Sequence, residues 1–336
     1  MPIQTAYYRQ EPVFLKPPDN GEKMLRKLIL GSALFMLTAC GAQTSTAVAQ
    51  NKQSAKETKT EQTQAPKQDI TTQKIGEGMY MLLGPGGNIG VSVGEGGVFV
   101  IDDKFARFAD QIISQIKGIT DQPIRYVVNT HYHGDHAGAN AQMKEAGATI
   151  MAHENVRKRM GLTFENKAFG RTVKATDPSL WPTLTFSDKA TLHFNGQTVS
   201  IIYTPNAHTD GDSIIYFKET NVLHMGDNFF NGMFPYIDID GGGSLQGMIA
   251  AHETALSLVN DETTIIPGHG PLAVKADLRK TQEMLKSIQN RVQSEISKGA
   301  TLEEILNKDL LKDLESFSSF IDTTNMVKFA HRSLTL

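Results

Sequence analysis

Thr130-His131-Tyr132-His133-Gly134-Asp135-His136 is the stretch that decides the fold, because it places three histidines and one aspartate within six residues. An apolar, β-like run at 124–129 leads into it, and a small-residue, helix-prone run at 137–144 leads out of it. The pattern predicts a turn between a strand and a helix, where side chains fan out from a rigid support. Imidazole and carboxylate groups are the usual zinc ligands. Four such groups in the form H-x-H-x-D-H therefore predict a metal site.

The composition limits what kind of site this is. The chain has 336 residues, a formal net charge of −3 and one cysteine, Cys40. A single cysteine allows neither an internal disulfide framework nor a zinc site built from thiolates. The charge gives no basic field for nucleic acid. Any metal must be held by His, Asp and Glu, and the expected partner is a small-molecule substrate.

The first 72 residues differ in composition from the rest. Residues 1–23 are polar, precede a second methionine and are interpreted as a non-native or disordered leader. Residues 24–40 carry a basic start, a short apolar run and small residues, which together are typical of a signal peptide. Their end, Leu-Thr-Ala-Cys, resembles the bacterial lipobox, which implies cleavage before Cys40 and lipid attachment to it; the alternative is a buried cysteine in a core helix. Residues 41–72 contain almost no large apolar side chain and predict a disordered linker.

The signal-like run, the lipobox at Cys40 and the linker together predict an exported protein, anchored by lipid to a membrane of the cell envelope and facing the periplasm.

Hydrophobic periodicity predicts alternating strands and helices from about Ile75 onward. The expected strands are 79–83, 89–93, 97–102, 124–129, 148–152, 191–194, 198–203, 213–217, 222–225 and 263–266. The expected helices are 105–119, 154–160, 244–258 and several within 272–331. Residues 161–185 read as an irregular loop, either a lid over the site or a packed surface loop. The order predicts a two-sheet core flanked by helices.

Further ligand-type residues follow three later strand-like runs. His208 comes after the strand at 198–203, Asp227 after the strand at 222–225, and His269 after the strand at 263–266. Glycines stand near each of them, so the backbone can turn sharply there and approach closely. These residues are candidates for the other part of the site.

The ordered set resembles the metallo-β-lactamase superfamily, from about Ile75 to Pro271. The resemblance implies an α+β fold, an αββα sandwich of two mixed sheets packed face to face with helices outside. It implies that residues 73–271 form this domain, with a C-terminal helical extension at 272–336. It also implies a site for two metals, most simply zinc, with iron or manganese left open. The implied ligands are His131, His133 and His208 for one metal, Asp135, His136 and His269 for the other, and Asp227 bridging both.

The resemblance further implies a metal-dependent hydrolase, in which a metal-activated water attacks a small ester, thioester or amide. A β-lactam is one named candidate. Asp135 would both bind metal and orient the water, as a catalytic residue. No lysine follows Asp227 to hold a lactam carboxylate; an apolar rim is expected instead, formed by Phe229, Phe230, Met233, Phe234 and Tyr236. The alternatives are a mononuclear iron enzyme of the persulfide dioxygenase kind and a non-catalytic metal-binding lipoprotein.

Several other polar residues are expected to support the site without binding metal. Asp102 is expected to orient a ligand, and Asp210 and Asp212 to orient or cap the loop around His208. His153 lies at a strand end and is not expected to be a ligand. The remaining histidines are expected to be structural: His193, His224, His252 and His331.

Overall fold

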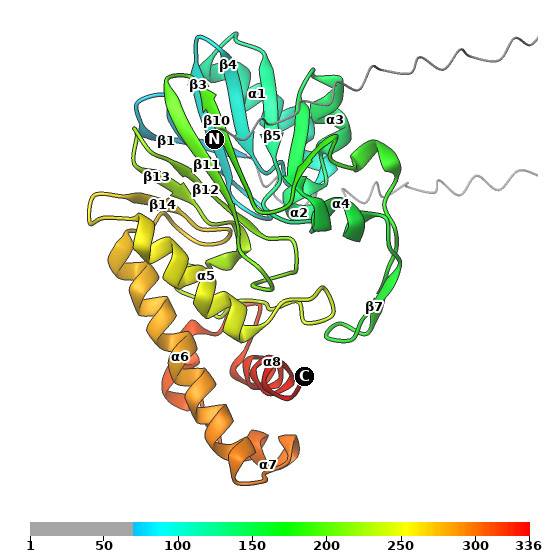
Figure 1. Ribbon diagram of the computed structural model, residues 1–336, viewed down its shortest axis with the longest axis vertical. Coiled ribbons are helices and arrows are strands. Elements are labelled where there is room, and N and C mark those ends of the chain that lie inside the picture. Colours follow the sequence, from blue (N-terminus) through cyan, green and yellow to red (C-terminus); the bar gives the residue numbers. More distant parts are fainter. Residues whose placement is uncertain (1–69) are drawn as a thin grey trace, which may run out of the picture. The chain divides into compact units, whose positions relative to one another are not determined.

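Two β-sheets lie face to face at the centre of the protein (Figure 1). The computed structural model describes residues 70–336. The predicted leader, the signal segment with Cys40 and nearly all of the predicted linker lie outside these residues. Among the described residues, helices that combine the length and the apolar character needed for a membrane span are absent.

The first sheet has seven strands in the order β1-β2-β3-β4-β5-β6-β9. They are β1 Thr71–Gly76, β2 Met79–Leu83, β3 Ile89–Gly94, β4 Gly97–Ile101, β5 Ile124–Val128, β6 Thr149–His153 and β9 Leu184–Phe186. Strands β1 to β4 pair antiparallel through short turns. β4, β5, β6 and β9 run parallel, so a longer crossover leads from each of them to the next.

The second sheet has five strands in the order β10-β11-β12-β13-β14. They are β10 Lys189–Phe194, β11 Gln197–Tyr203, β12 Ser213–Phe217, β13 Val222–His224 and β14 Thr264–Ile266. All neighbours are antiparallel except β13 and β14. The β10–β11 hairpin turns at Asn195 and Gly196, with φ of 52° and 72°, which is the left-handed backbone that an Asn-Gly turn adopts.

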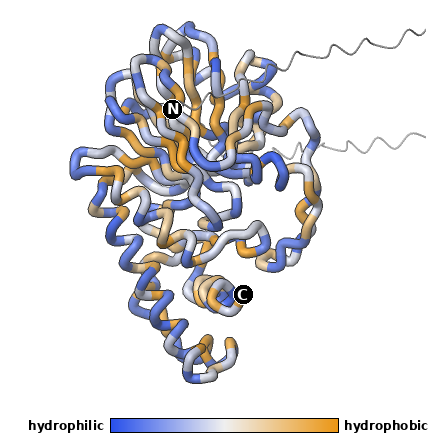
Figure 2. The backbone as a smooth tube through the Cα atoms, viewed as in Figure 1, coloured by the Kyte–Doolittle hydropathy of each residue, from blue (hydrophilic) through white to orange (hydrophobic). Residues whose placement is uncertain are grey.

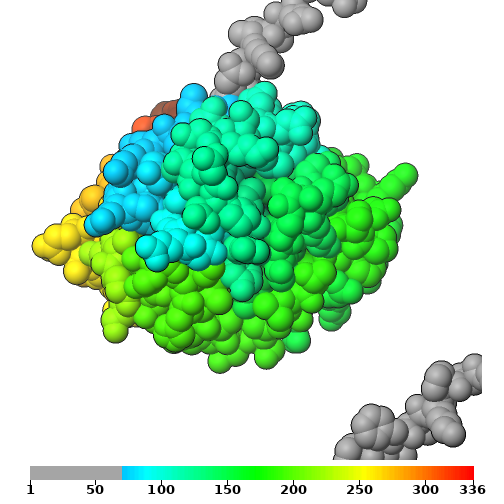
Figure 3. Space-filling view, turned by 90° about the horizontal axis from the view of Figure 1, so that it is seen from above, coloured from blue at the N-terminus to red at the C-terminus, as the bar shows by residue number. Residues whose placement is uncertain are grey.

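The space between the sheets is filled by one face of each. Its buried side chains come from alternate positions, such as Met79 and Met81 of β2 and Ile215 and Phe217 of β12. The rings of Phe99 and Phe217 meet edge to face with centroids 5.7 Å apart. Figure 3 shows residues of the early strands, in cyan, adjoining later green segments on one face of the molecule. The period-two pattern of the strands thus builds a dry inner layer.

Helices cover the outer faces of both sheets. The 3₁₀ turn η1 Ala106–Phe108 and helix α1 Ala109–Ile119 pack with α3 Asn140–Glu145 on the first sheet. Helix α5 Leu245–Leu258 covers the second sheet. Ser244 caps α5, because its side chain accepts a hydrogen bond from the N–H of Gly247. Shorter elements are α2 Gly134–Ala137, α4 Glu154–Met160, η2 Pro178–Leu180 and η3 Gly226–Asn228. The αββα sandwich predicted from the sequence is confirmed.

The C-terminal segment is helical, as expected, and shares a hydrophobic cluster with α5. It contains α6 Lys275–Ser297, α7 Leu302–Leu306, η4 Lys312–Phe317 and α8 Thr323–Thr335. Apolar side chains of α6 and α8 pack with Leu245 and Met248 of α5 and with Phe234. Figure 2 shows mostly hydrophobic colours along the strands, whereas α6 carries many hydrophilic residues. These helices therefore form a further layer on α5, with one side toward water.

The structure corrects two details of the sequence interpretation. Residues 161–185 are not irregular throughout, because they contain the hairpin β7 Phe164–Asn166 and β8 Arg171–Val173, and also β9. Three-residue strands are too short to show an alternating pattern, so periodicity could not reveal them. In addition, β1 begins at Thr71, inside the segment predicted as linker, and Ile70 before it is buried.

Candidate metal centre

The turn after β5 carries four candidate ligands at the end of a strand that lies between β4 and β6. β5 ends at Val128, and the N–H of Asn129 donates to the carbonyl of Met151 on the neighbouring strand. The short helix α2 then begins at Gly134, so that Asp135 and His136 stand in its first turn. Because the strand is paired on both sides, the side chains that follow it leave a rigid edge.

The first ligand group consists of His131, His133, His208 and Asp227. One ligand atom from each lies within 4.8 Å of all the others. Nδ1 of His133 is 3.1 Å from Nε2 of His131 and 2.9 Å from Nε2 of His208. Oδ2 of Asp227 lies 3.8 Å from Nε2 of His131 and 3.5 Å from Nε2 of His208. Residues from three distant segments thus converge on one point.

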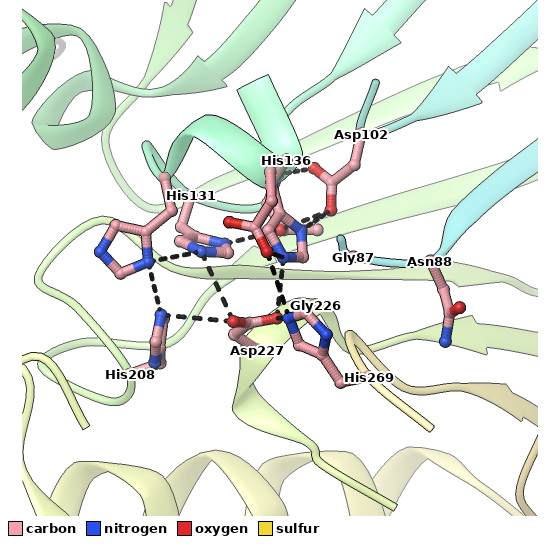
Figure 4. Close-up of polar contacts among 12 residues, drawn as sticks. Gly87, Asn88, Asp102, His131, His136, His208, Gly226, Asp227 and His269 are labelled. Atoms are coloured by element: carbon pink, nitrogen blue, oxygen red, sulfur yellow. Dashed lines mark hydrogen bonds and ion pairs between the residues drawn. The ribbon is translucent and has the colours of Figure 1, made fainter. Parts of the chain in front are cut away.

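The second ligand group consists of Asp135, His136 and His269, whose ligand atoms also lie within 4.8 Å of one another. Oδ2 of Asp135 is 3.4 Å from Nε2 of His269 and 3.7 Å from Nε2 of His136. Oδ1 of Asp227 is 2.9 Å from Nε2 of His136 and 3.3 Å from Nε2 of His269. Asp227 therefore turns one carboxylate oxygen to each group (Figure 4).

In His131, His136 and His208, the ring nitrogen that points away from the centre is hydrogen-bonded. Nδ1 of His136 donates to Asp102 at 2.7 Å, and Nδ1 of His208 donates to the carbonyl of Tyr236 at 2.8 Å. The hydroxyl of Thr130 donates to Asp102, so it accepts from Nδ1 of its neighbour His131. One buried carboxylate, Asp102, thus orients a histidine of each ligand group. This arrangement leaves the inward nitrogens with free lone pairs, as metal ligands require.

His133 is held in the opposite tautomer by Asp238. Its Nε2 lies 2.9 Å from Oδ2 of Asp238, so its Nδ1 faces the first ligand group. The same carboxylate accepts from the hydroxyls of Tyr132 and Tyr236 and from the N–H of Gly241. These bonds and the nearby histidines outweigh burial and hold the pKa of Asp238 below its ordinary value. Asp238 is therefore an anion that fixes the orientation of a candidate ligand.

The histidines of the two groups differ in their electrostatic surroundings. Burial lowers the pKa of His208 to about 4, and burial together with nearby histidines lowers the pKa of His131 well below its ordinary value. In the second group, burial is outweighed by carboxylates, chiefly Asp227, which raise the pKa of His136 and bring the pKa of His269 to about 9. The carboxylates around the second group, Asp227 among them, thus attract positive charge, which a metal cation supplies.

The donor atoms fit a metal pair. Nε2 of His136 and Oδ1 of Asp227 are buried and lack a hydrogen-bond partner among the described residues, although they are 2.9 Å apart. Two such atoms, close but not aligned with each other, are expected when both point at a common ion. The donors are nitrogen and oxygen only, a set that suits zinc, iron and manganese.

Two glycines allow the backbone to approach the ligands closely. A Cβ on Gly87 would lie 2.1 Å from Cε1 of the His136 ring, and a Cβ on Gly268 would lie 2.1 Å from Oδ1 of Asp227. Both distances are far below van der Waals contact, so any larger residue would displace a ligand. The buried Lys104 supports the first of these loops by donating to the carbonyls of Gly84 and Gly87.

A cavity of about 730 Å³ opens beside the ligands. Polar groups of the centre belong to its lining, among them His133, Asp135, Asp227 and His269. Aromatic and other apolar side chains line it too: Phe105, Phe169, Phe230, Met233, Phe234 and Phe320. The volume is in the range of small-molecule sites, and the cavity gives a ligand direct access to the candidate metal positions.

The apolar rim predicted after Asp227 is correct in part. Phe230, Met233, Phe234 and Tyr236 line the cavity. Phe229 does not, because it is fully buried against α5, in the cluster that contains Ala255. Adjacent residues of an extended segment point to opposite sides, so Phe229 and Phe230 cannot share a face.

The aspartates expected to support the site have separate partners. Asp102 orients His136 and, through Thr130, His131. Asp212 accepts from the N–H and hydroxyl of Thr209 and so closes the loop that carries His208. Asp210 instead forms an ion pair with Arg159.

The histidines not expected to be ligands lie outside both ligand groups. His153 caps α4, and its ring stacks on Tyr203 at 3.8 Å. His224 is buried against the carbonyl of Asn88, and His252 is buried against the carbonyl of Asn228. His193 is exposed on β10, and His331 is half-buried on α8.

Sequence reasoning missed Asp238, Thr130 and the hairpin β7–β8. Asp238 lies 105 positions from His133 and follows no strand. The only local signal was an aspartate in the loop after Tyr236, which is common in turns.

Comparison with known proteins agrees with this geometry. A model of the metallo-beta-lactamase superfamily matches residues 84–269, more than half of the chain. The chain therefore belongs to the metallo-beta-lactamase superfamily. It is a metal-dependent hydrolase with the fold of that superfamily.

Similar proteins lie at low identity. The hydroxyacylglutathione hydrolase GloC of Haemophilus influenzae is 26% identical over 184 residues, which are 53% of this chain and 84% of that protein. A hydroxyacylglutathione hydrolase of Nitrosococcus oceani is 29% identical over 149 residues, 44% of this chain and 48% of that protein. Among solved structures, a metallo-beta-lactamase from Pontibacter korlensis gives a TM-score of 0.55 at 16% identity, covering 65% of this chain and 99% of that one. The sec-alkylsulfatase Pisa1 from Pseudomonas sp. gives 0.59 at 18% identity, covering 79% and 50%.

Proposed function

We propose that the protein is a dinuclear zinc hydrolase that cleaves a small acyl thioester or ester. The observation that carries this proposal is the position of Asp227, whose two carboxylate oxygens face two separate ligand groups. A carboxylate in that position is suited to bridge two cations. His131, His133 and His208 would hold one zinc, and Asp135, His136 and His269 the other.

When bound, such a metal pair supplies a water of lowered pKa and a positive charge for the reacting carbonyl oxygen. The protein's own groups determine geometry and proton position. Asp135 lines the cavity, and nearby histidines, first His136, overcome burial to hold its pKa below the ordinary value. Its carboxylate is therefore an acceptor, able to orient the attacking water. The aromatic side chains of the cavity lining would shield a bound acyl group from bulk water.

The substrate class is inferred from the relatives and from the cavity. Two of the similar proteins are named hydroxyacylglutathione hydrolases, which indicates an S-acyl substrate for them. Apolar side chains that share the cavity with the ligands suit an acyl group. Amides, including β-lactams, are weaker candidates, because Phe229 and Phe230 follow the Gly226–Asn228 turn where a lysine could hold a lactam carboxylate.

A mononuclear iron dioxygenase is the second candidate. Iron suits the same nitrogen and oxygen donors, and three ligands are enough to hold it. The complete second ligand group favours two metals over one. A non-catalytic metal-binding role is disfavoured by the open cavity beside the ligands.

Metal analysis and substrate assays on the purified protein test the proposal. We expect two zinc ions per chain and hydrolysis of S-lactoylglutathione or a simple phenyl ester, with weaker action on nitrocefin. His131→Ala should lose metal and activity together, whereas His193→Ala, the same change at an exposed histidine of β10, should lose neither. One iron per chain together with oxygen uptake on glutathione persulfide would favour the dioxygenase. Zinc-loaded protein that cleaves no acyl compound would contradict the proposed function.

We also propose that the enzyme acts outside the cytoplasm, attached to a membrane through Cys40. The support is the sequence pattern at 24–40 alone. Cell fractionation of the full chain beside Cys40→Ser tests this: the substitution should release the protein from the membrane fraction.

A further inference from the structure

The mouth of the cavity carries side chains that metal binding and catalysis do not use. The hairpin β7–β8 contributes three such side chains to the cavity lining. Arg171 is on β8, Phe169 is in the turn between the strands, and Lys174 directly follows β8. The segment after η4 contributes Phe320. These residues are available to recognise a part of the substrate away from the scissile bond.

Two phenyl rings from distant segments meet at this mouth. The ring of Phe169 has its centroid 5.6 Å from that of Phe320 and 5.0 Å from that of Tyr236. Phe320 is 73% exposed and Phe169 is 39% exposed, which is unusual for side chains of this size. Exposed apolar groups gathered at the rim of a cavity indicate a surface that an apolar ligand covers.

Two cations, Arg171 and Lys174, line the same cavity as these rings. Among residues 70–336, neither Arg171 nor Lys174 forms an ion pair, whereas Arg159 of the same cavity is paired with Asp210. Strand alternation separates Arg171 from Glu165, an acid of the same hairpin. Thr172 points to the outer face, where its hydroxyl donates to Glu165, so that Arg171 points to the other face, toward the cavity. The guanidinium of Arg171 lies 5.3 Å from the centroid of the Phe169 ring.

We infer that the substrate is an anionic amphiphile. Its apolar part packs against Phe169 and Phe320, and its anionic group, a carboxylate or a phosphate, is held by Arg171 and Lys174. The inference rests on the proposed function for the scissile bond and adds the groups on either side of it. An unpaired arginine and lysine at a cavity mouth are suited to carboxylate and phosphate, since guanidinium and ammonium both form charge-assisted hydrogen bonds with them.

Binding of an inert thioether tests the inference without any catalytic step. The zinc-loaded protein is titrated by calorimetry with S-hexylglutathione, which has an apolar chain and two carboxylates, and with its diethyl ester, in which both carboxylates are masked. A third probe, S-hexyl-coenzyme A, presents phosphates instead. Three variants are compared with the wild type: the double variant Arg171→Gln with Lys174→Gln, Phe320→Ala, and Lys167→Gln. Lys167 is on the same hairpin but does not line the cavity, which makes it the matched control.

We expect the wild type to bind an anionic probe about tenfold more tightly than the diethyl ester, and the double variant to lose that preference. Phe320→Ala should weaken binding of all three probes, and Lys167→Gln should leave the preference intact. The tighter of the two anionic probes identifies the anion as carboxylate or phosphate. Equal affinity for masked and anionic probes, or a preference that survives in the double variant, would overturn the inference. Absence of hydrolysis with this preference present would count only against the proposed function.

Discussion

Replacing Asp102 by Asn should show that one buried carboxylate sets the tautomer of a metal ligand in each group. Asp102 accepts three hydrogen bonds, from the N–H and hydroxyl of Thr130 and from Nδ1 of His136. Asn has nearly the same shape and tolerates the left-handed backbone at this position, where φ is 64°. The substitution therefore changes hydrogen bonding with little change in packing.

The size of the effect follows from the number of acceptors. If the amide oxygen of Asn accepts from the N–H of Thr130, its NH₂ group faces the Thr130 hydroxyl and Nδ1 of His136. His136 must then carry its proton on Nε2, the atom that faces Asp227. A protonated Nε2 cannot bind metal. Loss of such an orienting partner weakens metal affinity by about 10- to 100-fold, or about 1.4–2.8 kcal/mol.

Competition with a chromogenic zinc chelator measures this change for each of the two metals. Asp212→Asn is the matched control, because Asp212 is also a buried carboxyl but its side chain accepts from Thr209 and not from the ring of a candidate ligand. Burial raises the pKa of Asp212 well above its ordinary value, so a neutral amide is a close substitute there. We expect this control to keep nearly wild-type zinc affinity. If Asp102→Asn binds both zinc ions as tightly as the wild type, the tautomer argument is refuted.

Three further outcomes are expected. Gly87→Ala should lose the metal of the second ligand group, because the new Cβ would lie 2.1 Å from Cε1 of the His136 ring; metal content by mass spectrometry checks this. Burial lowers the pKa of His252 to about 4 from 6.5, so the unfolded chain takes up the proton first. The free energy of unfolding therefore has its full value from this histidine above pH 6.5 and falls by about 3 kcal/mol as the pH falls to 4. Urea unfolding of His252→Gln should show a correspondingly flatter pH dependence. Arg332→Gln should destabilise the fold by about 1 kcal/mol, because the guanidinium donates two hydrogen bonds to Asp240; urea unfolding beside Arg332→Lys measures it.

Each of these three predictions would be contradicted by one specific result. Full metal content in Gly87→Ala would mean that the loop yields without moving His136. Parallel pH profiles for His252→Gln and the wild type would mean that this histidine is not kept neutral by burial. Wild-type stability of Arg332→Gln would mean that the link between α8 and Asp240 contributes nothing measurable.

The sequence by itself determined the fold class and the set of candidate ligands. The strands could be predicted because alternating side chains must enter a dry layer between sheets, as Met79 and Met81 do. The ligands could be found because His131 to His136 are adjacent in the chain and the others follow strand ends. Local chemistry and local periodicity are both visible in a sequence.

Only the tertiary structure decided how the ligands are held and what surrounds them. Asp238 supports His133 across 105 positions, and Asp227 divides its oxygens between two groups. The cavity wall joins β7–β8 to Phe320, more than 140 positions further along the chain. These contacts arise when separate elements pack together, and the side chains that make them carry no local pattern, because burial and partners are properties of the folded chain.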